Sequence, residues 1–180
     1  MLWPNQRCDL VQRKEPKSAI ICFSRTGHSA RLARKLEDRT GNLIVLIEAN
    51  RYPLGTIGFL RAVMDSVRNG LVLPNGFAAH LSSFDHLILC GPVWIGRPAA
   101  PLRAVLRSQN DTPQLISLFF TCGDAASGKK AIGIATQDLA RKLTTAEVLP
   151  NAIEGNEEET KVINRFTEAL DGFKYPPRLS

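Results

Sequence analysis

The strongest constraint on the fold comes from residues 18–39, where an apolar run leads directly into an amphipathic helix. Residues 19–23 are continuously apolar, which is typical of a strand buried on both faces because helices cover both sides of a parallel sheet. The helix that follows turns Leu32, Ala33 and Leu36 inward. Its outward side carries Arg31, Arg34, Lys35 and Glu37. This pattern predicts a layered α/β structure.

The turn between this strand and this helix carries three hydroxyl groups and a glycine: Ser24, Thr26, Gly27 and Ser29. Free backbone N–H groups and the positive end of the helix dipole face such a turn. Gly27 allows close approach of the backbone to a ligand, and hydroxyl groups donate to anionic oxygens. The turn is therefore predicted to bind phosphate.

Two other interpretations concern the same residues. Cys22, His28 and Ser29 come within one substitution of the Cys-x5-Arg-Ser loop of low-molecular-weight phosphatases, but His28 stands where a guanidinium must hold the phosphoryl group. Cys22 also lies inside the apolar run, where a thiol is usually inert. Alternatively, the turn is an ordinary helix start without a ligand. We favour the phosphate site over both.

Length and composition fit one globular domain of 180 residues, 44% of them hydrophobic. No apolar run approaches the ~20 residues of a membrane span, and the start does not resemble a signal peptide. The four cysteines show no Cys-x-x-Cys spacing, so we expect reduced thiols in a cytoplasmic protein. The net charge of +6 favours anionic partners, although it also describes a merely basic solvated surface.

Apolar runs and helical patterns alternate along the chain. Strands are expected at 19–23, 42–49, 84–90, 115–120 and 144–149, and helices from the first turn to about residue 40, within 51–70, through Leu102, Val105 and Leu106, at 129–143 and at 156–170. The alternation predicts a three-layer, doubly wound, five-stranded parallel sheet with strand order 2-1-3-4-5. The domain spans 18–172, between an N-terminal arm (1–17) and a C-terminal tail (173–180). In the last helix Asn156 and Glu159 are expected to form a capping box.

Three loops follow strands of this sheet: 24–29, 91–97 and 121–128. Parallel sheets bind ligands beyond the carboxyl ends of their strands, so the three loops should meet at one edge. Their sequences resemble the flavodoxin-like family, which binds FMN, over residues 18–170. Ser24-x-Thr26-Gly27-x-Ser29 is similar to its phosphate loop, Gly91-Pro92-Val93-Trp94-Ile95-Gly96-Arg97-Pro98 to its first flavin loop, and Thr121-Cys122-Gly123-Asp124 to its second.

This resemblance implies that one FMN binds non-covalently and that the flavin performs the chemistry. The residues expected to bind it are Ser24, Arg25, Thr26, Gly27, His28, Ser29, Pro92, Val93, Trp94, Ile95, Gly96, Thr121, Cys122, Gly123 and Asp124. Trp94 is the expected neighbour of the flavin ring, with a core or interface role as the alternative. Backbone N–H groups of Gly123 and Asp124 would lie at the ring edge that becomes negative on reduction.

Two departures from the family pattern favour an enzyme. Small residues, Ala125, Ala126 and Ser127, replace the tyrosine that many flavodoxins stack on the ring, and the chain is basic where electron carriers are acidic. We therefore expect an oxidoreductase that passes electrons from NAD(P)H to a quinone or similar acceptor. Arg97 and Ser127 are its candidate substrate contacts, an ion pair being the alternative for Arg97. A flavodoxin that serves a redox partner protein, and an interaction module without cofactor, are the other hypotheses; self-association is left open.

The other motifs in the sequence give weaker indications of function. Gly123 to Lys129 begins like a Walker loop, but Lys130 stands where a Mg²⁺-binding hydroxyl belongs. No His, Cys or Asp cluster has metal-ligand spacing, and His80 and His86 are expected to be structural. Arg31, Arg34, Lys35 and Arg39 form a basic helix face that lacks base-stacking groups, so a solvated face is preferred to a nucleic-acid site.

Overall fold

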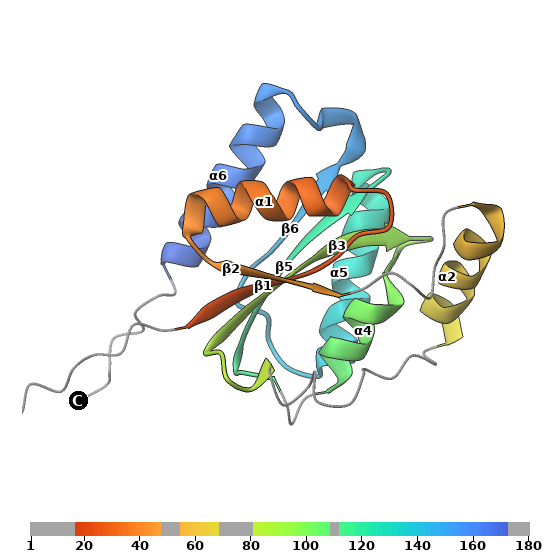
Figure 1. Cartoon of the computed structure of the whole chain (residues 1–180), viewed down its shortest axis with the longest axis horizontal. Helices are drawn as coiled ribbons and strands as arrows, with labels where there is room; N and C mark the ends of the chain where they lie inside the picture. The colour runs from red at the N-terminus through yellow and green to blue at the C-terminus, as the bar shows by residue number, and fades with distance from the viewer. Residues whose placement is uncertain (1–16, 48–54, 69–80, 109–111, 173–180) are drawn as a thin grey trace, which may run out of the picture.

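Five parallel strands form the centre of the computed structural model, in the order β2-β1-β3-β5-β6, with the short β4 antiparallel to β3 (Figure 1). The structure describes residues 17–47, 55–68, 81–108 and 112–172. The strands are β1 (Ser18–Phe23), β2 (Leu43–Ile47), β3 (His86–Trp94), β4 (Arg97–Pro98), β5 (Leu115–Cys122) and β6 (Ala146–Pro150). The order matches the predicted 2-1-3-4-5, because β4 is the only strand within the described residues that the sequence did not lead us to expect.

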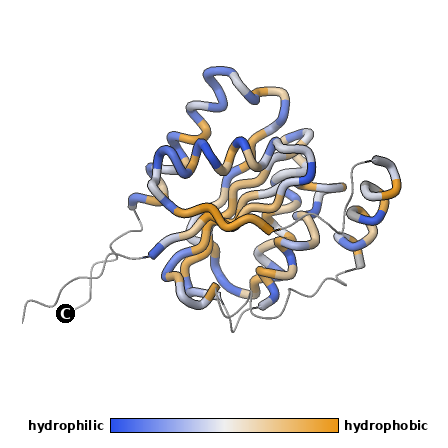
Figure 2. Tube along the Cα trace, in the orientation of Figure 1, coloured by the Kyte–Doolittle hydropathy of each residue, from blue (hydrophilic) through white to orange (hydrophobic). Residues whose placement is uncertain are grey.

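Helices cover both faces of the sheet, as Figure 1 shows. They are α1 (His28–Thr40), α2 (Thr56–Arg68), α4 (Ala100–Arg107), α5 (Ala125–Leu139) and α6 (Glu157–Asp171), and a 3₁₀ turn, η2 (Asn151–Ile153), follows β6. The central strands are hydrophobic along their length, whereas α1 is mainly hydrophilic on its visible side (Figure 2). The three-layer α/β architecture is confirmed.

The alternation of side chains along β1 divides the core into two layers. All of residues 19–23 are fully buried, as expected for a strand covered on both sides. Ile20 and Cys22 pack with the inner faces of α1 and α6. Ala19, Ile21 and Phe23 pack with those of α4 and α5. The predicted inner residues of α1 (Leu32, Ala33, Leu36) and α6 (Val162, Ile163, Phe166, Leu170) are all buried.

The first flavin loop was predicted as a loop over 91–98 but is mostly a hairpin. β3 continues through Trp94, and Val93 and Trp94 pair with Pro98 and Arg97 of β4. Ile95 and Gly96 form the two-residue turn, with φ of 51° and 67°. Positive φ at both positions matches the right-handed twist of the strands. The prediction of a loop was wrong because the short antiparallel pairing of β3 with β4 leaves no periodic pattern in the sequence.

Several element ends differ from their prediction. β5 extends two residues further, through Cys122, and α5 begins at Ala125 rather than at 129 and ends at Leu139 rather than at 143. α5 begins early because Asp124 Oδ1 accepts a hydrogen bond of 2.8 Å from Ser127 N–H and caps the helix. β2, β6 and α6 lie within one or two residues of the predicted bounds at each end that the structure describes.

The predicted capping box of α6 is only half correct. Asn156 Oδ1 accepts hydrogen bonds from the N–H groups of Glu158 and Glu159, as predicted. Glu159, however, accepts from Gly155 N–H and pairs with Lys35 instead of reaching Asn156 N–H. The basic face of α1 is exposed at Arg31, Arg34, Lys35 and Arg39, and Arg31 and Lys35 also form ion pairs with Glu154 and Glu159.

The arm residues 1–16, the tail 173–180 and His80 lie outside the described residues, so the predicted domain bounds stay a prediction. α2 falls within the predicted 51–70, and its Leu60, Met64 and Val67 are exposed among the described residues. None of the helices that the structure describes is long and apolar enough to cross a membrane.

Candidate functional site

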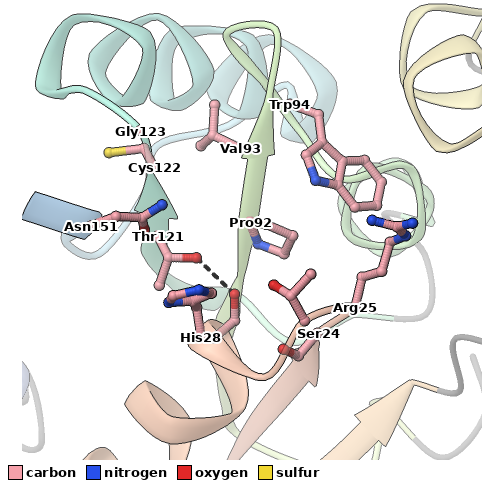
Figure 3. A pocket seen from close by; sticks show the side chains of 12 residues that line it. Ser24, Arg25, His28, Pro92, Val93, Trp94, Thr121, Cys122, Gly123 and Asn151 are labelled. Atoms are coloured by element: carbon pink, nitrogen blue, oxygen red, sulfur yellow. Dashed lines mark hydrogen bonds between the residues drawn. The ribbon is translucent and has the colours of Figure 1, made fainter. Parts of the chain in front are cut away.

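The ends of β1, β3, β5 and β6 surround a cleft of about 180 Å³ at the carboxyl edge of the sheet (Figure 3). Its lining consists of Ser24, Arg25, Thr26, His28, Ser29, Pro92, Val93, Trp94, Thr121, Cys122, Gly123 and Asn151. All of these except Asn151 belong to the three loops predicted to converge. The convergence follows from the topology, because each loop leaves a parallel strand at the same edge.

The loop before α1 begins the helix without a side-chain cap. Gly27 is the N-cap, with φ 93°, a left-handed conformation that glycine adopts readily. Its N–H donates to Ser24 Oγ at 3.1 Å, and its carbonyl accepts the first helical hydrogen bond, from Arg31 N–H at 2.9 Å. The N–H groups of His28, Ser29 and Ala30 therefore lack helical acceptors, as the first turn of a helix requires. Glycine is itself an ordinary helix start, so the N-cap alone does not distinguish a phosphate site from a helix start without a ligand.

The hydroxyl groups of this loop differ in whether they are free to contact a ligand. Ser29 is buried, and its Oγ lies 2.7 Å from Thr121 Oγ1, so it ties the first loop to the third. Ser24 Oγ accepts from Gly27 N–H. Thr26 is exposed, and its hydroxyl has no hydrogen bond within the described part of the chain. Thr26 is thus the hydroxyl most open to a ligand.

An acidic and basic cluster adjoins the cleft beside His28. Glu154 Oε2 lies 2.5 Å from His28 Nδ1, and Glu154 Oε1 accepts from Arg31 Nε at 2.7 Å. Burial alone would raise the pKa of Glu154, but hydrogen bonds from His28 and Arg31, and their charges, bring that pKa below the ordinary value. Sequence reasoning missed both Glu154 and Asn151. They follow β6, the last parallel strand, and applying the strand-end rule to that strand would have found them.

Trp94 stands in the cleft wall at the end of β3. Its indole packs edge-on against Phe23, with ring centroids 5.6 Å apart and an interplanar angle of 88°. Arg25 extends from the first loop toward this indole (Figure 3), and its Nη2 donates to Gly55 O at 2.7 Å. The aromatic group and the first loop therefore form one side of the cleft together.

Six predicted site residues do not line the cleft: Gly27, Ile95, Gly96, Arg97, Asp124 and Ser127. Asp124 and Ser127 are engaged with each other in the cap of α5, and the hydrogen bonds from Ser127 hold the pKa of Asp124 below its ordinary value. Ile95 is exposed at the tip of the hairpin. Gly27 shapes the first loop through its backbone, and Arg97 lies in β4.

The buried thiols do not form a nucleophilic centre. Cys22 is fully buried, and its Sγ lies 3.6 Å from Ser29 O. Cys90 forms a similar contact at 3.4 Å, and its pKa is raised well above the ordinary value by the hydrogen bond with Cys22 and by burial. Cys122 reaches the cleft, but burial raises its pKa to about 11. A cysteine phosphatase needs an accessible thiolate, so this geometry does not support that interpretation.

Gly128, the second glycine of the Walker-like sequence, is a packing residue. A Cβ at Gly128 would lie 2.8 Å from Val148 Cγ1 and 3.0 Å from Cys122 Sγ, so α5 approaches β6 closely at this point. His86 is also structural, with Nε2 2.9 Å from Ser117 Oγ. The described residues contain no cluster of His, Cys, Asp and Glu that could hold a metal ion.

No protein-family model matches this sequence, and no curated protein matches it at a significant level. Solved structures do resemble it. A candidate flavoprotein from Bacteroides uniformis aligns at 17% identity over 86% of this chain and 99% of its own, with a TM-score of 0.66. A flavoprotein from Lactobacillus acidophilus, solved with FMN, aligns at 16% over 77% and 95%, with a TM-score of 0.59.

An NAD(P)H:quinone oxidoreductase from Methanothermobacter marburgensis aligns at 13% identity over 91% of this chain and 98% of its own, with a TM-score of 0.55. The chain has the flavodoxin-like fold. The strand order and the position of the cleft at the carboxyl edge are those that the sequence motifs led us to expect.

Proposed function

We propose that this protein binds FMN in the cleft and acts as an oxidoreductase that passes electrons from NAD(P)H to a quinone or a similar acceptor. The observation that carries the proposal is the convergence of the three loops that resemble flavin-binding loops on one cleft. The flavodoxin-like structures solved with FMN and for an NAD(P)H:quinone oxidoreductase support it.

The donors at the first loop fit a phosphate monoester. The N-terminus of α1 presents backbone N–H groups that have no helical acceptor, and the hydroxyl of Thr26 is open. Arg25 and His28 add positive or proton-donating groups to the same wall. Helix N-termini with such donors hold phosphate through the helix dipole and through hydrogen bonds. We assign the phosphate of FMN to this end of the cleft.

The rest of the cleft lining suits one part of the flat flavin ring of FMN. Pro92, Val93 and Trp94 supply apolar and aromatic surface, and Gly123 adds backbone. A cleft of about 180 Å³ is smaller than the ~300–1,000 Å³ of pockets that enclose a ligand of this size, so the described residues would cover the ring only in part. Ala125 and Ala126 are small and exposed beside this wall. An uncovered ring face leaves room for a nicotinamide.

The bound FMN would supply the hydride and electron chemistry, and the chain's own residues would hold and orient it. The positive net charge of +6 would attract the multiply charged NAD(P)H, an effect that salt should weaken. Cys22, Cys90 and Cys122 are free thiols, which suits a reducing compartment, and we place the activity in the cytoplasm.

The first test measures FMN binding to Thr26→Val beside a matched control. Loss of one charge-assisted hydrogen bond to phosphate should weaken FMN binding about tenfold or more. Thr136→Val is the control, because the Thr136 hydroxyl donates to Ile132 O on the exposed side of α5. Fluorescence titration gives both affinities. Equal loss in the two variants, or none in Thr26→Val, would place the phosphate elsewhere.

A visible absorption spectrum of the FMN-loaded protein, recorded anaerobically before and after the addition of NADPH or NADH, tests whether the protein is an oxidoreductase. Direct reduction within minutes supports the oxidoreductase. A flavin that stays oxidised until a separate reductase is added identifies an electron carrier, and a purified protein that takes up no FMN contradicts both functions.

A further inference from the structure

His28, Arg31 and Glu154 form a connected group beside the phosphate end of the cleft. Glu154 lies in the turn after η2, yet its two carboxylate oxygens contact two residues of the first turn of α1, at 2.5 Å from His28 Nδ1 and 2.7 Å from Arg31 Nε. His28 lines the cleft, whereas Arg31 and Glu154 stand behind it. The group therefore joins the last loop of the sheet edge to the first.

The contact with Glu154 decides which protons His28 carries. A carboxylate at 2.5 Å accepts a hydrogen bond, so Nδ1 must carry a proton and donate to it. Arg31 Nη2 lies 2.9 Å from the same nitrogen, but a guanidinium can only donate and therefore cannot accept this proton. Arg31 instead forms an ion pair with Glu154. Nε2 is left with no partner among the described residues. A neutral ring with its proton on Nδ1 exposes a lone pair on Nε2.

A phosphate dianion interacts differently with the neutral and the protonated imidazole ring of His28. The lone pair of a neutral Nε2 repels phosphate oxygens, whereas a protonated Nε2 donates a charge-assisted hydrogen bond to them. A protonated ring would form an ion pair with Glu154, whose Oε2 lies 2.5 Å from Nδ1. The hydrogen bonds that hold the pKa of Glu154 below the ordinary value keep it ionised near neutral pH.

We propose that His28 takes up a proton when a phosphate monoester binds in the cleft and donates it from Nε2 to the phosphate, with Glu154 as the positioning residue. This inference rests on the proposed phosphate site and deepens it. It assigns to Glu154 and His28 a selectivity for the dianionic terminal phosphate of FMN. Riboflavin has no phosphate, and the internal phosphates of FAD each carry a single charge.

The other charged groups around His28 leave it as the proton-exchanging group. Arg25, across the cleft, and Arg31 keep their charge at all relevant pH values. Cys122, in the opposite wall, has a pKa of about 11 and stays neutral. Imidazole is the side chain that gains or loses a proton near neutral pH. Proton uptake on binding therefore reports His28.

Isothermal titration calorimetry of the full chain with FMN, at pH 7.5 in buffers of different ionisation enthalpy, measures this uptake directly. The phosphate of FMN has its second pKa near ~6, so it is already a dianion and protons must come to the protein. We expect a measurable fraction of one proton in the wild type and none for riboflavin. His28→Asn should abolish the uptake and weaken FMN binding roughly tenfold.

Glu154→Gln tests the positioning role against Glu158→Gln, which removes the same charge from an exposed pair with Lys161. Glu154→Gln should weaken FMN binding several-fold at pH 7.5. Lowering the pH to 6.5 should restore much of the lost affinity, because the higher proton concentration then drives the proton uptake that accompanies binding. The loss in His28→Asn should not recover. Glu158→Gln should match the wild type throughout. Circular dichroism checks that each variant is folded.

Equal proton uptake in the wild type and in His28→Asn would overturn the inference while leaving FMN binding intact. The same holds if Glu154→Gln behaves like Glu158→Gln. If the wild type binds no FMN, the proposed function fails, and titration with methyl phosphate then tests the cluster alone. Proton uptake with that ligand supports a phosphate site of another specificity, and its absence overturns the inference as well.

Discussion

Two glycines in the loops of this protein fulfil different physical needs. Gly27 adopts a φ of 93° at the start of α1, and a Cβ there would make only an ordinary contact at 3.7 Å with Arg31. Gly128 needs no unusual backbone, but it lacks space for a Cβ beside Val148 and Cys122. A glycine can therefore mark a turn near a ligand or a close approach between a helix and a strand, and the sequence alone does not distinguish them.

Gly128→Ala should reduce the free energy of unfolding by about 1–2 kcal/mol, because overpacking exceeds the gain in helix propensity. Gly123→Ala is the matched control, since nothing lies within 4 Å of a Cβ at that position. Its effect on unfolding should stay within about 0.5 kcal/mol. Urea unfolding measures both. A Gly128→Ala variant as stable as Gly123→Ala would mean that α5 can shift away from β6 at little cost.

At the scale of elements, a buried ion pair joins three helices. Arg103 of α4 is 4% exposed and forms two hydrogen bonds with Asp138 of α5, at 2.5 and 2.9 Å. Its third nitrogen donates to Ser66 O of α2 at 2.6 Å, and Ser66 Oγ accepts from Ala100 N–H. This network fixes α2 to the helical layer, although much of the apolar side of α2 is exposed among the described residues.

Asp138→Asn should cost about 3 kcal/mol or more of unfolding free energy, because it leaves the buried guanidinium of Arg103 without its counter-charge. Glu158→Gln, which breaks an exposed ion pair on α6, should cost less than about 1 kcal/mol. Chemical unfolding of the two variants gives the comparison. Similar costs for the two would show that solvent reaches Arg103 and screens its charge.

The stability of the whole molecule should depend on pH through His86. This side chain is buried at the start of β3, and burial lowers its pKa to about 4. An unfolded histidine has a pKa near ~6.5, so between these values the unfolded chain binds more protons than the folded one. The contribution of His86 is complete above about pH 6.5 and is lost as the pH falls toward 4.

The free energy of unfolding should therefore fall by about 3 kcal/mol between pH 7 and pH 4 because of His86 alone. His86→Gln keeps a hydrogen-bonding group near Ser117 but does not titrate, so its pH dependence should be weaker by that amount. Urea unfolding of both proteins at several pH values measures the difference and cancels the shared contribution of the carboxylates. Parallel pH profiles would contradict a buried neutral His86.

The sequence by itself determined the order of elements and the edge of the sheet at which the cleft lies. A run of apolar residues at 19–23, the helical spacing of Leu32, Ala33 and Leu36, and similar patterns further along report burial over a few neighbouring residues. Parallel topology then places every strand-ending loop at one edge. Eleven lining residues could be named in this way because they lie in the last residues of a strand or directly after it.

Only the tertiary structure decided how those loops contact one another. The contact between His28 and Glu154 joins residues 126 positions apart, and the one between Ser29 and Thr121 joins residues 92 apart. Periodicity records which side of a strand or helix is buried. It does not record which distant side chain meets it, because that depends on the packing of the whole sheet edge.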